Sequence, residues 1–566
     1  MFHIGPIAGV AAHGPWVASA GYDNRLILWD AATREAVARA THDHLVNACD
    51  FSHDGQWLIS ASSDYSARIW SVPDLRLHAV LGGHGDDVDM AGFSPDDRLV
   101  ATCALDRIVR VFDRLGRCLH AMAGHTGNVL ALAWIDATRF VTTSVDGTLR
   151  EWDAIAGKAL RVIPIGMRTD CVAIAPDGRI IAGDDAGRIA VSISGGDPEF
   201  VAAHAAGIKK LVLSRDGSRL VTLGYDRAIA VWSMAPGGLP ELVARREVPA
   251  LIWARAAAFC ADGRVAVGTF GGTYALFDPA TGDWDMSGVV AGDAINAATE
   301  IAGQVLTIGD AGVLRSHGEA VATIGSLCNF LTQAGGRLFT GGHLGEVYDA
   351  RTGGVLHRHH SPLNCAVGFV RGGIDHLAVG TYTGEILIFA LAGRATLVRT
   401  LRPYANAVKA LAACGDLLFS VCANTDVAWH DMTVGREVRR VARAHTRIAN
   451  AACALGASGF ASVGRDRMLR LWLANGDIAV ETPHPNSVKC MAASPDGRWI
   501  VSGSYGGTVA VFDRATMAFA PMRRIAKAGI SALCWSERTG GFLAADYAGD
   551  VHPIAVLAAT AQRIAA

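Results

Sequence analysis

The chain has 566 residues, a formal net charge of −2 and 18% charged residues. This length exceeds one ordinary hydrophobic core and predicts two or more domains. The near-neutral charge comes without a basic patch, so we expect neither a nucleic-acid-binding protein nor a membrane-surface protein. No positively charged leader and no apolar run of about 18 residues occur, so neither a signal peptide nor a membrane span is expected.

The basic residues and the cysteines bear on source and compartment. Only six of the 51 basic residues are Lys, and Gly is abundant at 64 residues, which favours GC-rich coding and a bacterial source. The 12 Cys show no zinc-type spacing. Five of them lie in apolar stretches that suit a small buried thiol: Cys49, Cys171, Cys453, Cys490 and Cys534. We therefore expect reduced cysteines, no metal, no cofactor and a cytoplasmic protein.

The stretch 125–153, HTGNVLALAWIDATRFVTTSVDGTLREWD, defines a module that recurs along the chain. The position of Trp152 returns at a mean spacing of about 40 residues, which gives fourteen units. One step, from His317 to Tyr348, is shorter than the others. The fourteen positions are Trp29, Trp70, Phe112, Trp152, Ser192, Trp232, Phe277, His317, Tyr348, Phe389, Trp429, Trp472, Phe512 and Ile554.

Each unit carries four strand signals. In the second unit they are VNACDFS at 46–52, QWLISASS at 56–63, SARIWSV at 66–72 and LRLHAVL at 75–81. Asp and Gly in the turns between them tolerate positive φ. A four-stranded antiparallel sheet of this size cannot bury both faces alone, whereas sheets stacked around an axis bury their faces against one another. The pattern predicts an all-β propeller.

Two short motifs connect the repeat to a known family. A Trp-Asp pair ends the third strand signal at 29–30 and 152–153, with Phe-Asp or Tyr-Asp in its place at 112–113, 277–278, 348–349 and 512–513, and Gly-His opens units at 83–84 and 124–125. The chain resembles the WD-repeat family of β-propellers over essentially its whole length. In that family seven blades usually close a ring, so the resemblance implies two tandem seven-bladed WD-repeat propellers with four antiparallel strands per blade. One fourteen-bladed ring would require a different wedge angle between blades.

A polar set accompanies the Trp position. An Asp lies six residues before it, a Ser or Thr four residues before the Asp, and a His about 22 residues before the Asp. The first unit is expected to lack the His. Complete sets occur in units 2, 4, 6 and 12: His42, Ser60, Asp64 and Trp70; His125, Thr142, Asp146 and Trp152; His204, Thr222, Asp226 and Trp232; His445, Ser462, Asp466 and Trp472. The family implies that these side chains form a hydrogen-bonded chain across three strands of one blade.

The same trio of hydroxyl, His and Asp could be interpreted as a catalytic triad. A hydrolase needs one triad in one cleft with an oxyanion hole, whereas this trio recurs in several units, which favours a structural role. Unit 13 has Gly506 where the Asp is expected, and units 5, 7 to 11 and 14 lack most of the set. We therefore expect a well-preserved N-terminal propeller at 1–290 and a degenerate C-terminal one at 291–566.

Partner binding is expected on the face formed by the loops between the second and third strands. In the family this face commonly binds partners, and the residue just before the Asp points to it. Consecutive units around the first ring place aromatic residues there, and exposed aromatic clusters are typical of interfaces. The predicted contact residues are Tyr22, Tyr65, Tyr225, Trp253 and Phe270 in the first propeller and Tyr505, Tyr547 and Arg465 in the second. The alternative is that the aromatics pack on neighbouring blades or cover the channel mouth.

Three further points remain as expectations. Arg465, with Arg467, could hold a carboxylate or phosphate. His357, His359, His360 and His376 are close in sequence, but no Cys or carboxylate is evident to complete a metal site. Each ring is expected to close with sequential blades, the tail at 557–566 offering the last outer strand.

Two classes of function follow. The absence of catalytic motifs and the large repeat surface favour a non-catalytic scaffold that binds proteins or peptides, as a subunit of a larger assembly. The alternative is a propeller enzyme or small-molecule binder that uses a central channel. That alternative requires convergent, unrepeated polar residues at one channel mouth, whereas most titratable residues here belong to the repeat.

Overall fold

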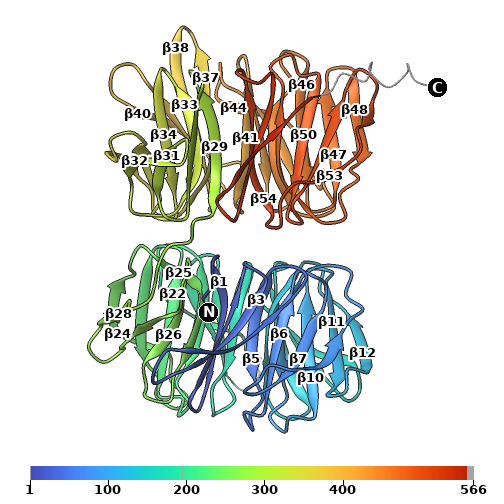
Figure 1. The fold of residues 1–566 in the computed structure, drawn as a ribbon. Helices are drawn as coiled ribbons and strands as arrows, with labels where there is room; N and C mark the ends of the chain where they lie inside the picture. Colours follow the sequence, from blue (N-terminus) through green and yellow to red (C-terminus); the bar gives the residue numbers. More distant parts are fainter. Residues whose placement is uncertain (1, 194–195, 557–566) are drawn as a thin grey trace, which may run out of the picture. The chain divides into compact units, whose positions relative to one another are not determined.

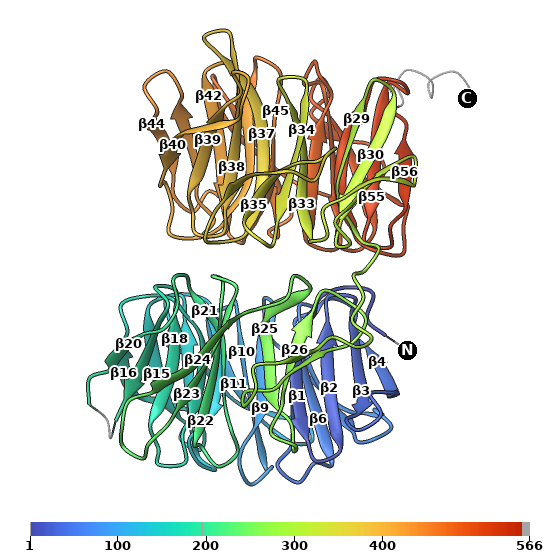
Figure 2. The ribbon, with the colours of Figure 1, turned by 90° about the vertical axis from the view of Figure 1, so that its left-hand side faces the viewer.

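The computed structural model describes residues 2–193 and 196–556, and its regular structure is entirely β. It divides into two compact units, Met1–Gly292 and Asp293–Ala566. Each unit contains seven separate antiparallel sheets, which we number as blades 1–7 and 8–14. Figures 1 and 2 show each unit as a ring of upright sheets around a central axis. The sequence-based prediction of an all-β fold built from fourteen repeated antiparallel sheets is confirmed for the described residues, and the arrangement is consistent with two tandem WD-repeat propellers.

The first strand of every blade lines the central channel of its unit, because adjacent first strands pack side by side around the ring. In the first unit these inner strands are β1 (Ile7–His13), β5 (Val46–Phe51), β9 (Val88–Phe93), β13 (Val129–Trp134), β17 (Thr169–Ile174), β21 (Ile208–Leu213) and β25 (Ile252–Phe259). In the second unit they are β29 (Ile295–Ile301), β33 (Cys328–Ala334), β37 (Leu363–Arg371), β41 (Val408–Cys414), β45 (Ala449–Ala454), β49 (Val488–Ala493) and β54 (Ile530–Ser536).

Blade 4 shows how the sequence produces one sheet. β13 is followed by β14 (Arg139–Ser144), β15 (Thr148–Asp153) and β16 (Lys158–Pro164), each antiparallel to the one before. Gly147, at φ +77°, forms the tight turn between β14 and β15, where a left-handed residue is required. The middle strands are largely buried, whereas β16 is mostly exposed. The apolar core therefore lies between neighbouring blades and not inside a single sheet.

The last two blades depart from this plan. The outer edge of blade 13 consists of two short pieces, β52 (Ala518–Phe519) and β53 (Arg523–Arg524), both paired with β51 (Thr508–Asp513). In blade 14 the described strands are β54, β55 (Gly541–Asp546) and β56 (Val551–Ile554). The predicted use of 557–566 as the final outer strand lies outside the described residues.

Both rings close by packing their first blade against their seventh. Every described sheet is built from consecutive strands, so the expectation of sequential blades is confirmed for this part of the chain. In the first unit the backbone of His3 exchanges two hydrogen bonds of 2.9 Å with Gly272 of blade 7. In the second unit the Glu300 carboxylate, at the end of β29, accepts a 2.6 Å bond from the Ser536 hydroxyl at the end of β54.

Strand pairing corrects the Trp-equivalent position in two units. In blade 4 Trp152 pairs with Phe140, two residues before the hydroxyl residue Thr142. In blade 9, Tyr348 pairs with Thr340 itself, so the predicted position is two residues too early. In blade 11 the residue that pairs with the position two before the hydroxyl residue is His430. The predicted Trp429 is one residue too early and lies on the opposite face of β43 (Val427–Asp431). This misplacement accounts for part of the short step in the repeat.

We expect His3→Ala to loosen the seam of the first ring. The substitution removes the imidazole that links the N-terminal segment to the side chains of Ser19 and Asp23 at 2.8 and 2.9 Å. Amide hydrogen exchange of the full chain should become faster in 7–30 and 265–277 than in the other blades of the first unit. Phe2→Ala, one residue earlier and 63% exposed, is the control. Equal exchange in all three proteins would contradict a sealing role for His3.

Candidate functional site

The polar set of blade 4 is a continuous hydrogen-bonded chain that joins β15, β14, the turn between them and the loop before β13. The Trp152 Nε1–H group donates to Thr142 Oγ1 at 2.8 Å, and the same oxygen lies 2.8 Å from His125 Nε2. His125 Nδ1 lies 2.9 Å from Asp146 Oδ2. Because the indole is only a donor, the Thr142 hydroxyl accepts from it and donates its own proton to His125 Nε2. His125 then carries its proton on Nδ1 and donates it to Asp146. We call this arrangement a clamp.

Electrostatics agree with this proton arrangement. Burial lowers the pKa of His125, an effect that the Asp146 carboxylate offsets in part, so the imidazole is neutral in the folded chain. Burial alone would raise the pKa of Asp146. Hydrogen bonds from Thr148 and His125 overcome this effect and lower the pKa to about 2. Asp146 therefore stays ionised and fixes the tautomer of the histidine.

The three other predicted clamps have the same geometry. The His-to-Asp distances are 2.8 Å in blade 2, 2.8 Å in blade 6 and 3.0 Å in blade 12. In each of them the Trp indole donates to the hydroxyl at 2.8 to 3.0 Å. The twelve side chains are His42, Ser60, Asp64 and Trp70; His204, Thr222, Asp226 and Trp232; His445, Ser462, Asp466 and Trp472. The interpretation of these residues as blade clamps agrees with their contacts.

Blade 1 also has a complete clamp, which corrects the expectation that its His is absent. His3 lies 2.8 Å from Ser19 and 2.9 Å from Asp23, and Trp29 donates to Ser19 at 2.7 Å. His3 precedes its Asp by 20 residues, whereas the other histidines precede theirs by 21 or 22. The spacing rule placed the expected residue too close to the N-terminus, and a search of two residues on either side would have found it.

Blade 11 has a substitute clamp that the repeat pattern did not reveal. The Tyr404 hydroxyl lies 2.8 Å from Ser420 Oγ, and His430 Nε2 lies 2.8 Å from the same oxygen. Tyr404 replaces the His and His430 replaces the Trp, and both are buried. A search for fixed residue types misses this arrangement, because two members changed together while the central hydroxyl remained.

The clamps do not have the setting of a catalytic triad. The hydroxyl groups of Ser60, Thr142 and Thr222 belong to residues with 0% exposure. Each hydroxyl is also engaged by the Trp indole of its own blade, so it has no path to a substrate and no free lone pair directed at a cleft. This geometry serves to hold the third strand to the loop that enters the blade.

Three of the predicted aromatic residues meet at one face of the first unit. The rings of Tyr22 and Trp253 contact edge to face at a centroid distance of 5.0 Å, and Trp253 stacks on Phe270 at 5.9 Å. Phe270 is only 3% exposed, so it supports Trp253 from below and is not the exposed contact residue that the sequence suggested. Tyr22 and Trp253 are partly exposed. We call Tyr22, Trp253 and Tyr225 the aromatic patch.

The remaining predicted contact residues have different settings. Tyr225 is partly exposed, and the Lys209 ammonium lies 4.7 Å from its ring centroid. Tyr65, at φ +70°, is the left-handed residue of the turn after β6 (Trp57–Ser62). Tyr505 and Tyr547 stack at 6.3 Å in the second unit, and the Arg465 guanidinium lies 5.9 Å from the Tyr505 ring.

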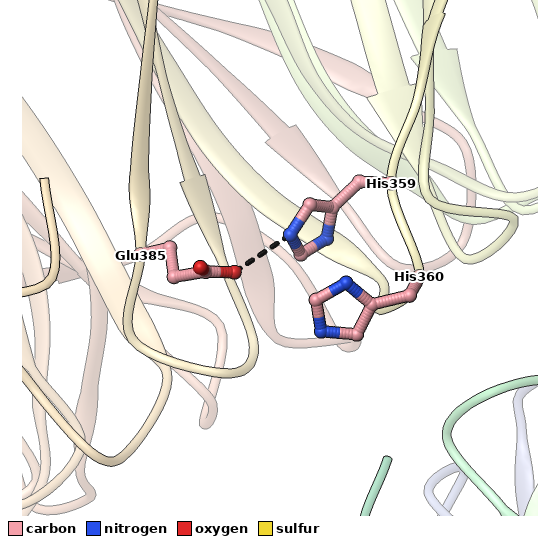
Figure 3. Close-up of side chains that lie close together, drawn as sticks. All are labelled: His359, His360 and Glu385. Atoms are coloured by element: carbon pink, nitrogen blue, oxygen red, sulfur yellow. Dashed lines mark hydrogen bonds and ion pairs between the residues drawn. The ribbon is translucent and has the colours of Figure 1, made fainter. Parts of the chain in front are cut away.

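One group of histidines lies beside a carboxylate that the sequence did not indicate. His359 Nε2 lies 2.7 Å from Glu385 Oε2, and the His360 ring lies tilted beside that of His359 at a centroid distance of 4.1 Å (Figure 3). Their ligand atoms all lie within 4.8 Å of one another, so the three residues could hold a metal ion. Glu385 also pairs with Arg402 at 3.0 Å, and that positive charge opposes a cation. His357 and His376 do not belong to this group.

His359 occupies the clamp position of blade 10. Its backbone N–H donates to Gly345 O, just as His204 N–H donates to Gly187 O. The His359–Glu385 pair is therefore a rewired clamp in which the carboxylate comes from the start of the third strand. A second group that could hold a cation, Asp546, Asp550 and His552, surrounds the turn between β55 and β56.

The two channels differ in their charges. The second residue of most inner strands lines the channel, and in the first unit three of these residues are charged: Asp89, Asp170 and Lys209. Lys210 and Arg255 also line this channel. Lys209 is neutralised by Asp170 at 2.5 Å and by Asp185, and Arg168 pairs with Asp170 at 2.7 Å. Lys209 and Arg168 at this channel mouth thus have anionic partners within the blades.

Comparisons with known proteins agree with the repeat. The sequence profile of the family described as "WD domain, G-beta repeat" matches 3–30, 37–71, 75–113, 116–153 and 478–513. Four of these segments lie in the first unit and one in the second, in line with the stronger clamps of the first unit. Together with the relatives below, these matches support a WD-repeat family for the chain.

Relatives match about a quarter of the chain. "Ribosome biogenesis protein WDR12 homolog" of Drosophila persimilis is 25% identical over 27% of this chain and 42% of its own length. "WD repeat-containing protein 1" of Rattus norvegicus is 28% identical over 25% of this chain and 24% of its own. "Nuclear distribution protein PAC1" of Arthroderma benhamiae is 28% identical over 28% of this chain and 40% of its own. All three are eukaryotic, so they give no support to the bacterial source that the composition favoured.

Thr142→Val tests the clamp. Valine keeps the shape of threonine but leaves the Trp152 donor and the His125 acceptor without their partner, which costs about 2–4 kcal/mol of unfolding free energy. Hydrogen exchange in 125–164 should become faster by a corresponding factor. Thr126→Val, which changes an exposed threonine in the same blade, should behave like the unmodified protein. A loss below about 0.5 kcal/mol for Thr142→Val would argue against the clamp as a source of stability.

The second unit should lose stability in mild acid. Burial lowers the pKa of His430 and of His484 to about 4, below the usual value of about 6.5. Between these values the unfolded chain binds protons that the folded chain does not, so stability is complete above pH 6.5 and falls toward pH 4. Calorimetric unfolding at pH 7 and pH 5 should show this loss, and the double variant His430→Gln, His484→Gln should reduce the difference between the two pH values.

Exposed His317 provides the matched control for that experiment. His317→Gln removes a histidine from the same unit and should leave the pH dependence unchanged. If the double variant and the control show the same dependence on pH as the unmodified chain, the buried histidines are not its cause.

Proposed function

We propose that the protein is a non-catalytic scaffold that binds partner proteins or peptides through the aromatic patch of its first unit, as a subunit of a larger assembly. The observation that carries this proposal is the convergence of Tyr22 and Trp253, from blades 1 and 7, over the buried ring of Phe270. Large aromatic rings that are held rigidly and partly exposed supply much of the binding energy of protein interfaces.

The support beneath the patch adds to the argument. Phe270 prevents Trp253 from collapsing into the blade, and Arg255 lies 5.6 Å from the Trp253 ring centroid. The patch therefore loses little conformational entropy when a partner binds, which favours affinity. The WD-repeat relatives include a protein named for ribosome biogenesis, and an assembly subunit is in line with that kind of role.

The proposal includes a cytoplasmic location. All 12 cysteines are unpaired, as is usual in a reducing compartment. No helix in the described part of the chain is long and apolar enough to cross a membrane.

The double variant Tyr225→Ala, Trp253→Ala tests the proposal. Affinity purification from the native cell, quantified by mass spectrometry, should recover the partners at least about tenfold less well with this variant. Phe200→Ala, at a 40% exposed aromatic residue of the outer strand β20 (Glu199–Ala202), is the matched control and should recover them fully. If the double variant folds normally and still recovers every partner, the patch is not the binding site.

A further inference from the structure

In the second unit, the channel-facing second residue of every inner strand is polar. The second residues of its inner strands are Asn296, Asn329, Asn364, Lys409, Asn450, Lys489 and Ser531, and all seven line one cavity. The cavity has a volume of about 250 Å³, against about 90 Å³ for the channel of the first unit. No residue that lines it is acidic. At the same level, the first unit carries Asp89 and Asp170.

The asparagines of this ring are used to join the blades. The Nδ2 groups of Asn329, Asn364 and Asn450 each donate to the first residue of the neighbouring inner strand, at 2.7 to 2.8 Å. Asn296 does the same with Cys328 O at 3.1 Å and also donates to Asp310 at 2.8 Å. These bonds keep the ring rigid, so Lys409 and Lys489 project from a fixed frame.

The two lysines have no acidic partner. Among the described residues, no carboxylate pairs with the ammonium group of Lys409 or of Lys489, whereas Lys209 in the first unit pairs with two. The Lys409 ammonium lies 5.9 Å from the ring centroid of Tyr382. Ammonium groups that are largely withdrawn from water are costly unless an anion or several oxygen atoms compensate them.

Further groups strengthen the positive character of this channel mouth. Lys409, Arg465 and Lys489 come from the consecutive blades 11, 12 and 13. Burial first, and then the positive charges of Lys489 and Arg465, lower the pKa of Lys409 to about 7. Burial raises the pKa of the Asp310 carboxyl group, which accepts a hydrogen bond from Asn296, to about 7, so this group is only partly ionised at pH 7. The phenol groups of Tyr505 and Tyr547 lie on the same side and can donate hydrogen bonds.

We propose that the channel mouth of the second unit binds a small polyvalent oxyanion through Lys409, Lys489 and Arg465, with phosphate groups as the favoured class. Lysine recognises phosphate as a point charge, and arginine can offer two parallel N–H donors. A phosphate or diphosphate supplies negative charge beside the two lysines. The source is either free phosphate or the phosphate end of a metabolite. This inference goes beyond the scaffold function, since it concerns a different unit and different residues.

Calorimetric titration of the full chain with inorganic phosphate, and separately with pyrophosphate, tests the proposal. The titrations are made at pH 7 and low salt, because salt screens the attraction. We expect one site per chain, tighter for pyrophosphate. The double variant Lys409→Met, Lys489→Met keeps the aliphatic stems and should weaken binding at least about tenfold. Lys527→Met removes an exposed lysine of the same unit and should bind like the unmodified chain.

A second variant and a second readout distinguish a loss of binding from misfolding. Lys489→Arg keeps the charge and should retain binding, and anion-dependent stabilisation against heat should appear wherever binding is retained. Absence of binding to both anions, or equal binding by the double variant, would overturn the proposal. Succinate that binds as tightly as pyrophosphate would replace phosphate with carboxylate as the ligand class. Tight binding of ATP or another phosphorylated metabolite, with weak binding of inorganic phosphate, would support the metabolite source.

Discussion

The stacking of the blades and the closure of both rings depend on one constraint. A four-stranded sheet of this length cannot bury its two apolar faces by itself. The faces are covered only when each blade packs between two others, so the first and seventh blades of each unit must also meet. The seams show how this is achieved. In the first unit His3 links the N-terminal segment to both sides of the seam. In the second unit the Glu300 carboxylate accepts a hydrogen bond from Ser536. Closure leaves a central channel in each unit, and the channel is where the two units differ.

The two rings use different polar bonds to reach the same architecture. The first unit relies on clamps within blades, each centred on a buried hydroxyl such as that of Thr142. The second unit has fewer complete clamps, but four of its asparagines each tie one inner strand to the next. In the first unit Asn47 makes this contact, with Val88 O at 2.9 Å. Where the second half loses the WD signature, hydrogen bonds between inner strands take the place of clamps within blades, and the blade structure is retained.

This difference also separates the two candidate sites. At the first channel mouth Lys209 is matched by Asp170 and Asp185, which leaves the partly exposed rings of Tyr22 and Trp253 as the chemically distinctive surface. At the second mouth the lysines have no carboxylate partner in the described residues. An aromatic surface suits a protein partner, and two lysines without a carboxylate partner among the described residues suit an anion. Two rings of one fold can thus present two different chemistries, because the channel-facing positions are free to vary while the blade cores are not.

The sequence by itself determined the number of blades, their strands and the clamps of blades 2, 4, 6 and 12, because these depend on local spacing that repeats about every 40 residues. It also predicted that Tyr22 and Trp253 lie on one face, and these two rings are in contact. Tertiary structure alone decided what joins distant segments: that His3 completes the first clamp, that Tyr404 and His430 replace the usual pair, and that Glu385 lies beside His359. It alone showed that Phe270 is buried and that Lys409 and Lys489 face one cavity without acids. These outcomes depend on which side chains meet across blades, and a repeat pattern read along one chain does not contain that information.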